Sequence, residues 1–211
     1  MMFSSRVPFS HRPPLTLRSA TWIILLLWLV YTILYTLHPS DAPAVFLEFV
    51  PGVLAVAALL AAGISRQECY LRIAPISRTG LKLLAVSFLF VPIILLTGHW
   101  RGWNGPSVLV YALASGISQE LFFRAALLPL LLAKFKSKPF LAISIHSLFF
   151  ALWHAPKAYM TAPLGGLIGV VAVTFINGLL WARQVERDRT VVWLMGYHSI
   201  LLFINSFFTW E

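Results

Sequence analysis

Six polar side chains of the types found in hydrolytic sites lie within apolar stretches of the C-terminal half. They are Gln119, Glu120 and Arg124 in the stretch 107–133, His154 in 139–160, and His198 and Asn205 in 191–209. An ionisable side chain at the centre of a membrane helix costs at least about 2.5–3.5 kcal/mol, so such residues are candidates for function. Their occurrence on three separate stretches predicts one shared polar cavity.

A carboxylate, two imidazoles and an amide can together hydrolyse a peptide bond. The reaction needs a base that activates water, an acid for the leaving amine and donors for the oxyanion. A carboxylate shielded from bulk water suits proton transfer, imidazoles position the water, and the Asn205 amide completes the oxyanion hole. Two histidines and a glutamate also form zinc sites, but the H-E-x-x-H spacing of such sites is missing. We therefore predict no metal and no cofactor, and the single cysteine, Cys69, is predicted to be a bystander.

Simpler structural roles compete with chemistry at each polar position. Glu120 and Arg124 are four residues apart, so their side chains meet on one helix face and can serve as a buried ion pair alone. His146 is interpreted as a structural or supporting residue. Glu48 is predicted to be solvated near the outer membrane interface, and Asn177 is predicted to bridge helices.

Membrane-spanning helices must position these residues, because the composition excludes an ordinary water-facing surface. Hydrophobic residues make up 59% of the 211 residues and charged residues 11%, whereas a soluble domain carries roughly 25% charged residues. We predict an all-α, polytopic transmembrane helix bundle of about seven spans. The apolar stretches are 20–37, 43–64, 83–98, 107–133, 139–160, 164–182 and 191–209. We expect one membrane domain over 1–211, with three N-terminal spans in 1–106.

The basic residues predict the orientation of the bundle. The formal net charge is +9, and thirteen of the sixteen Lys and Arg residues fall in the N-terminal tail and in alternate junctions. Arg101 falls in an opposite junction, Lys157 falls near the outer end of the stretch 139–160, and Arg124 falls within a span. The positive-inside rule then places the N-terminus in the cytoplasm and Glu211 outside. The charge indicates a lipid bilayer as partner and no nucleic acid.

Three motifs in the C-terminal half resemble those of the CPBP family, the CAAX-protease and bacteriocin-processing membrane proteins also called Abi. That family carries E-E-x-x-x-R, F-x-x-x-H and H-x-x-x-N, in this order. Here the corresponding segments are 119–124, Phe150 to His154, and His198 with the downstream Asn205. The resemblance covers 107–209 as a CPBP-like catalytic core, and the first three spans match only as generic membrane helices.

The resemblance implies a glutamic-type intramembrane endopeptidase and a role for each matched residue. It implies that His154 positions the water and that His198 donates to the oxyanion. It also implies that Glu120 and Arg124 form a supporting pair. We expect such a protein in the bacterial inner (plasma) membrane.

Two positions depart from the family pattern. Gln119 stands where the family has its general base, and glutamine cannot accept a proton from water. Leu202 stands where the third motif has its asparagine, and Asn205 is the nearest amide, about one turn further along. Either Glu120 takes over as the base, or catalysis is impaired.

Two functions therefore stay open. In the first, the protein is an intramembrane endopeptidase that cleaves a membrane-anchored peptide or protein tail, with water activated by Glu120 and the histidines. In the second, it is a catalytically impaired relative that binds or regulates a membrane partner. A small transporter is a third reading that rests only on polar groups in a bundle, and no inverted repeat supports it. The sequence specifies neither the substrate nor the oligomeric state.

Overall fold

The helices follow the apolar stretches, and the fold is all-α as predicted. The computed structural model describes residues 13–37, 47–97, 99–100, 106–161 and 164–209. Its helices are α1 (Leu17–Leu37), α2 (Phe49–Ala61), α3 (Arg78–Ser87), α4 (Phe90–Thr97), α5 (Pro106–Phe122), the π-helix η2 (Phe123–Leu127), α6 (Leu128–Lys134), α7 (Pro139–Thr161), α8 (Leu164–Asp188) and α9 (Val192–Asn205). Two short strands, β1 (His99–Trp100) and β2 (Phe208–Thr209), pair antiparallel. Arg6, Arg12, Arg101 and Glu211, which the orientation prediction used, lie outside the described residues.

Four helical segments of the described chain are long and apolar enough to cross a membrane. They are Leu17–Leu37, Leu109–Lys134, Pro139–Met160 and Leu164–Asp188. α2 and α9 are apolar but have only 13 and 14 residues, which is about 20 Å at a rise of ~1.5 Å per residue. The hydrocarbon core of a bilayer is about 30 Å thick. The predicted count of seven spans and the orientation therefore stay predictions.

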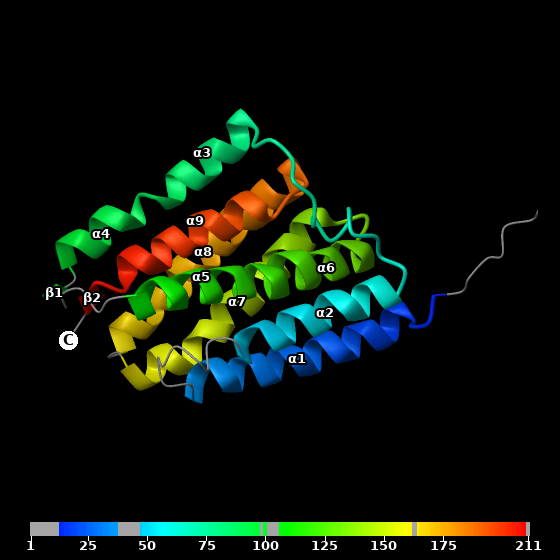
Figure 1. Ribbon diagram of the computed structural model, residues 1–211, viewed down its shortest axis with the longest axis horizontal. Helices are drawn as coiled ribbons and strands as arrows, with labels where there is room; N and C mark the ends of the chain where they lie inside the picture. The colour runs from blue at the N-terminus through cyan, green and yellow to red at the C-terminus, as the bar shows by residue number, and fades with distance from the viewer. Residues whose placement is uncertain (1–12, 38–46, 98, 101–105, 162–163, 210–211) are drawn as a thin grey trace, which may run out of the picture.

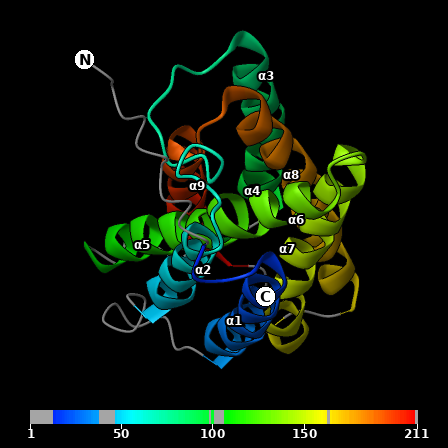
Figure 2. The same ribbon diagram turned by 90° about the vertical axis from the view of Figure 1, so that its right-hand side faces the viewer.

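α5, η2 and α6 run end to end through the middle of the bundle (Figure 1). α1 and α2 lie on one side of this central segment, and α9 lies on the other with α3 and α4 beyond it. The view turned by 90° agrees with this arrangement (Figure 2). Most of the central segment is buried, whereas most of α1 and α8 faces outward. Other helices therefore surround the polar residues of the stretch 107–133.

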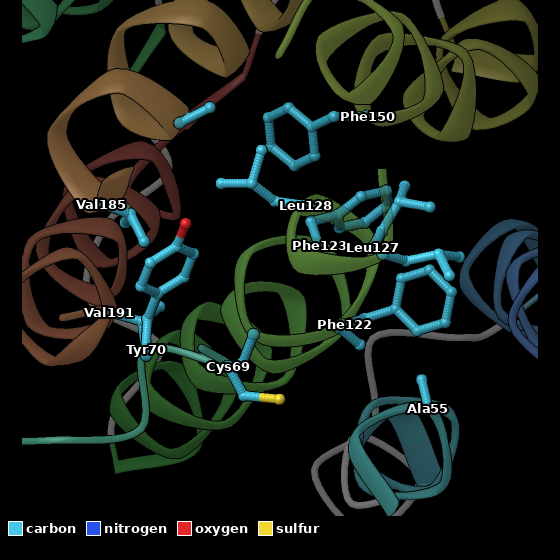
Figure 3. Packing of buried hydrophobic residues seen from close by; sticks show 14 of the residues in the cluster. Ala55, Cys69, Tyr70, Phe122, Phe123, Leu127, Leu128, Phe150, Val185 and Val191 are labelled. Atoms are coloured by element: carbon cyan, nitrogen blue, oxygen red, sulfur yellow. The ribbon is translucent and has the colours of Figure 1, made fainter. Parts of the chain in front are cut away.

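Aromatic and aliphatic side chains of the central segment form the middle of the core (Figure 3). Phe122 and Phe123 are fully buried, and Leu127 and Leu128 extend the same packed surface. The ring centre of Phe123 lies 5.0 Å from that of Phe150 on α7, in an edge-to-face arrangement. This packing fixes η2 and α7 against each other next to the polar residues.

Cys69 lies at the edge of this core, in the junction between α2 and α3 (Figure 3). Burial raises the pKa of its thiol to about 11. The thiol is therefore protonated at neutral pH, and a protonated thiol is a poor nucleophile. The structure agrees with the prediction that Cys69 is a bystander.

Two of the basic junctions meet at one end of the bundle. Arg72, between α2 and α3, donates from Nε to the backbone oxygen of Arg189, between α8 and α9, at 2.9 Å. The backbone N–H of Val191 donates to the backbone oxygen of Tyr70 at 3.1 Å. Both junctions are among those predicted to be cytoplasmic, and the orientation prediction requires them to lie on the same side.

The central helix changes from α to π geometry between Phe123 and Leu127. Pro129 has no N–H to donate to the carbonyl of Ala125, and its ring crowds that turn. A wider turn relieves this crowding, and single π turns of this kind are frequent at functional sites. Arg124 lies within the π-helix. The π turn was therefore predictable from the position of Pro129 in the sequence.

α5 and α9 cross closely at Gly116. A Cβ atom on Gly116 would lie 2.5 Å from Ser199 Oγ and 2.8 Å from the Ser199 backbone nitrogen. Because part of the obstacle is backbone, α9 has to move before a side chain fits there. The crossing holds His198, the residue before Ser199, against α5.

The Gly116→Ala variant is expected to lower the free energy of unfolding by about 1–3 kcal/mol, the usual cost of overpacking a tight contact. Gly196→Ala on α9 is the matched control, because no atom lies within 4 Å of its Cβ position. That change removes a helical glycine, which stabilises a helix by roughly 0.5–1 kcal/mol. SDS-induced unfolding in mixed micelles measures both variants. Equal unfolding curves for the two would show that the crossing tolerates a side chain.

Candidate functional site

Glu120, Arg124 and His198 meet at one carboxylate oxygen. Glu120 Oε1 accepts a hydrogen bond from Arg124 Nη1 at 3.0 Å and another from His198 Nδ1 at 2.7 Å. Glu120 and Arg124 are fully buried, and His198 is almost so. The pair four residues apart forms as predicted, and α9 adds the histidine. Because a carboxylate holds Nδ1, the orientation of the His198 ring is fixed and Nε2 is left for another group.

The guanidinium of Arg124 is held between aromatic rings. Its Cζ lies 4.0 Å from the centre of the Phe150 ring and 5.1 Å from that of Trp181. Desolvated cation–π contacts of this kind are worth about 2 kcal/mol or more. Within the described residues, Arg124 Nε and Nη2 have no hydrogen-bond partner. The positive charge of Arg124 therefore depends on the Glu120 carboxylate and on the two rings.

His154 reaches the same cluster through Phe150. Its Nδ1 lies 2.8 Å from the backbone oxygen of Phe150, one turn earlier on α7. Since a carbonyl oxygen can only accept, Nδ1 carries the proton and Nε2 of the neutral ring has a lone pair. The ring centre of Phe150 is 4.7 Å from that of His154 and 6.4 Å from that of His198. Both histidines therefore contact one phenyl ring.

Gln119 belongs to a second polar cluster. Its Nε2 donates to Ser115 Oγ at 2.9 Å, and Ser115 Oγ donates to Glu48 Oε2 at 3.1 Å. The hydroxyls of Tyr31 and Ser118 are hydrogen-bonded to each other at 3.0 Å beside it. Gln119 is buried, and its Oε1 has no hydrogen-bond partner in the part of the chain that the structure describes. These residues join α1, α2 and α5.

The prediction that Glu48 is solvated at the membrane interface is wrong. Glu48 is 2% exposed at the start of α2, with Ser115 Oγ and Ser118 Oγ 3.1 and 3.5 Å from its Oε2. Lys157, near the end of α7, is close enough to be attracted by the Glu48 charge. The prediction failed because it used only the position of Glu48 along its own stretch. Helices that are distant in sequence cover the residue.

Three other polar residues lie apart from the Glu120 carboxylate. Asn205 ends α9, about 10 Å along the helix axis from His198 at ~1.5 Å per residue, so the structure does not bring it to the cluster. His146 is fully buried beside the Phe123 ring, and among the described residues no hydrogen bond joins it to Glu120. Asn177 is buried on α8, and its Oδ1 bridges to no other described helix.

An apolar crevice of about 430 Å³ runs between α7 and α8. Ala155, the neighbour of His154, lines it on α7, and Leu167 and Val171 line it on α8. A crevice with only apolar walls suits a hydrocarbon chain or an apolar peptide segment.

The two polar clusters supply the parts of a hydrolytic site. The Glu120 cluster orients one imidazole, the Phe150 carbonyl fixes the tautomer of the other, and Glu48 adds a second buried carboxylate. Among the described residues, no three His, Cys, Asp or Glu side chains converge as metal ligands do. This set can move protons and donate to an oxyanion with side chains alone.

Comparison with known proteins points to the same half of the chain. Residues 101–204 match a family model described as type II CAAX prenyl endopeptidase, Rce1-like. The matched region contains the candidate residues Gln119, Glu120, Arg124, His154 and His198, and it ends just before Asn205. The searches among curated proteins and among solved structures find no match. Together with the four long apolar helices, the family match identifies an integral, multi-pass membrane protein.

Proposed function

Residues 101–204 of this chain belong to the Rce1-like family of type II CAAX prenyl endopeptidases, and on this basis we propose that the protein is an intramembrane endopeptidase. It hydrolyses a peptide bond in a membrane-anchored peptide or protein tail. The observation that carries the proposal is the Glu120 carboxylate, whose Oε1 binds both Arg124 and His198. A structural ion pair needs only the arginine, whereas a carboxylate that also holds an imidazole is an arrangement used for catalysis.

The two histidines have different tasks in this proposal. His154 positions the attacking water through Nε2, because its Nδ1 is engaged by the Phe150 carbonyl. His198 is oriented by Glu120, and its Nε2 donates to the oxyanion when that nitrogen carries a proton. Glu120 and Arg124 keep each other's charge balanced in the bundle. The proposal gives Asn205 no role, because of its separation from His198.

The site is proposed to take a substrate that is itself anchored in the membrane. The crevice between α7 and α8 offers apolar walls for the anchor within one residue of His154. We place the N-terminus in the cytoplasm and the protein in the bacterial inner (plasma) membrane. The contact between the basic junctions at Arg72 and Arg189 supports one common cytoplasmic side.

The proposal is tested with purified protein in lipid vesicles and a library of peptides, each made with and without a C-terminal hydrocarbon anchor. Cleavage of anchored peptides at one defined bond is expected, detected by mass spectrometry, with little cleavage of their unanchored counterparts. A preparation in which His154 and His198 are both alanine measures contaminating peptidases. The endopeptidase proposal fails if no anchored peptide is cut, or if the double variant cuts as fast as the native chain.

One observation favours a second candidate function, that of a catalytically impaired relative which binds a membrane partner. Gln119 stands at the family's base position, and its amide is tied to Ser115. On this reading the native chain has no peptidase activity, and Gln119→Glu produces it. Cleavage by the native chain in the vesicle assay excludes this second function.

A further inference from the structure

We propose that Glu48 is the general base of this site and supplies the carboxylate that is missing at Gln119. The inference rests on the proposed endopeptidase function and deepens it. Glu48 is the second acidic side chain that the helices bury beside the candidate residues, and it comes from α2, outside the region matched by the family.

One hydroxyl group, that of Ser115, bridges the side chains of Glu48 and Gln119. Ser115 Oγ donates to Glu48 Oε2 at 3.1 Å and accepts from Gln119 Nε2 at 2.9 Å. Ser115 and Gln119 lie one turn apart on α5, so both point toward the start of α2. The Glu48 carboxylate therefore lies next to the place that a glutamate at position 119 would reach.

The hydrogen-bond directions leave one oxygen of Gln119 for a water molecule. Ser115 has a single hydroxyl hydrogen, which goes to Glu48, so the Gln119 nitrogen must be the group that donates to Ser115. Gln119 Oε1 then lacks a donor among the described residues although it is buried. A buried carbonyl oxygen is normally hydrogen-bonded. In the proposal, the attacking water donates to this oxygen, beside the amide that Ser115 links to the Glu48 carboxylate.

Glu120 is poorly suited to the same task. Its Oε1 already serves Arg124 and His198, at 3.0 and 2.7 Å. If Glu120 took up the proton of the water, the fully buried charge of Arg124 would lose its carboxylate partner, which is costly. Lys157, the cation near Glu48, is only partly buried, so the same loss costs less there. Glu120 is therefore better assigned to orienting His198, and the proton goes elsewhere.

Glu48 is also linked to His154 through its surroundings. Lys157, which the Glu48 charge attracts, lies 4.4 Å from the centre of the Tyr35 ring. The same ring lies 5.8 Å from the ring of His154, centre to centre. Tyr35 therefore lies between the surroundings of Glu48 and the ring of His154.

The proton movements balance with this one carboxylate. Glu48 takes a proton from the water as the water oxygen bonds to the scissile carbonyl carbon, and the carbonyl oxygen becomes the oxyanion. The carbon–nitrogen bond then breaks as the carbonyl re-forms, and Glu48 returns its proton to the leaving amine. The carboxylate is regenerated without any further reagent, as in other sites where one group acts first as base and then as acid.

A set of three variants tests the assignment on an anchored peptide that the native chain cleaves. Glu48→Gln is expected to lower kcat by about 10²–10⁴-fold, the usual contribution of a general base. Adding Gln119→Glu to Glu48→Gln is expected to recover at least about tenfold of the loss, because a carboxylate returns to the other end of the Ser115 bridge. Glu186→Gln, which removes an exposed carboxylate on α8, is the control and is expected to keep the native kcat.

A fourth variant separates chemistry from charge balance. If Glu48 only neutralised Lys157, replacing both with glutamine would restore activity; a base cannot be restored in this way. The double variant Glu48→Gln/Lys157→Gln is therefore expected to fold, because no lone charge is buried, and to stay inactive. Native kcat in Glu48→Gln, or recovery in the Glu48/Lys157 double variant, overturns the inference while native cleavage leaves the endopeptidase proposal standing. If the native chain cuts no anchored peptide, both proposals fall.

Discussion

Replacing His154 with alanine is expected to lower kcat/KM for cleavage of an anchored peptide by about 10²-fold, the usual cost of misplacing a reacting group by about 1 Å. The His154 ring is engaged at Nδ1 by the Phe150 carbonyl 2.8 Å away, so the water-positioning lone pair is on Nε2. Alanine removes that nitrogen and leaves the α7 backbone unchanged. Because the ring is only partly buried, the fold is expected to survive, which circular dichroism in detergent checks.

His99→Ala is the matched control for this prediction. His99 lies exposed on β1 and takes no part in the contact between His154 and Phe150. Removing its imidazole is therefore expected to leave kcat/KM unchanged. His154→Gln is a second check. Its amide can still hydrogen-bond water, so this variant is expected to keep more activity than His154→Ala. Activity of His154→Ala within about threefold of the native value would remove His154 from the mechanism, since loss of the group that positions the water is expected to cost about 10²-fold.

The long apolar helices were predictable because hydropathy and length are properties of the local sequence. The prediction for α1 missed its start by three residues, and that for α7 missed its end by one. α8 extends six residues past the predicted end at 182, since the polar segment stays helical after the apolar pattern stops. Gln184 donates to Asp188 one turn later, and the chain leaves the helix at Arg189, whose φ is 58°. Hydropathy predicts where lipid contact ends, which is not where the helix ends.

The candidate site was predictable only where its contacts are local. The ion pair of Glu120 and Arg124 follows from four-residue spacing on a helix. The bond from His198 to Glu120 joins residues 78 positions apart, and the sequence predicted only that they share a cavity. The contact between Glu48 and Ser115 was missed altogether. No spacing rule connects the two residues, because the contact depends on how α2 packs against α5.

Neighbouring residues on one helix explain how the two polar clusters stay separate yet adjacent. Successive residues of an α-helix point about 100° apart, so Gln119 and Glu120 face different neighbours. Gln119 points with Ser115 toward Glu48 on α2, and Glu120 points with Arg124 toward His198 on α9. α5 therefore carries both clusters, on faces about 100° apart. The family match covers one of them fully and leaves out the α2 residue of the other.

The Glu120→Leu variant is expected to lower the free energy of unfolding by about 3–5 kcal/mol, the usual cost of leaving one member of a buried ion pair alone. Arg124 is fully buried, and its Nη1 donates to Glu120 at 3.0 Å. Leucine leaves that positive charge against the Phe150 and Trp181 rings without a carboxylate. SDS-induced unfolding in mixed micelles measures the change.

Two further variants show whether the loss arises from the lone charge. Glu186→Leu removes the glutamate of the exposed pair with Arg183, 3.3 Å apart, and is expected to cost about 0–1 kcal/mol because water screens that pair. The double variant Glu120→Leu/Arg124→Leu removes both buried charges and is expected to regain most of the lost stability, as buried pairs replaced by apolar residues commonly do. Its peptidase activity is expected to stay low, because His198 has lost the carboxylate that orients it. If Glu120→Leu lowers the free energy of unfolding no more than Glu186→Leu does, the charge of Arg124 does not need Glu120 for its stability. The Glu120 carboxylate would then serve only to orient His198.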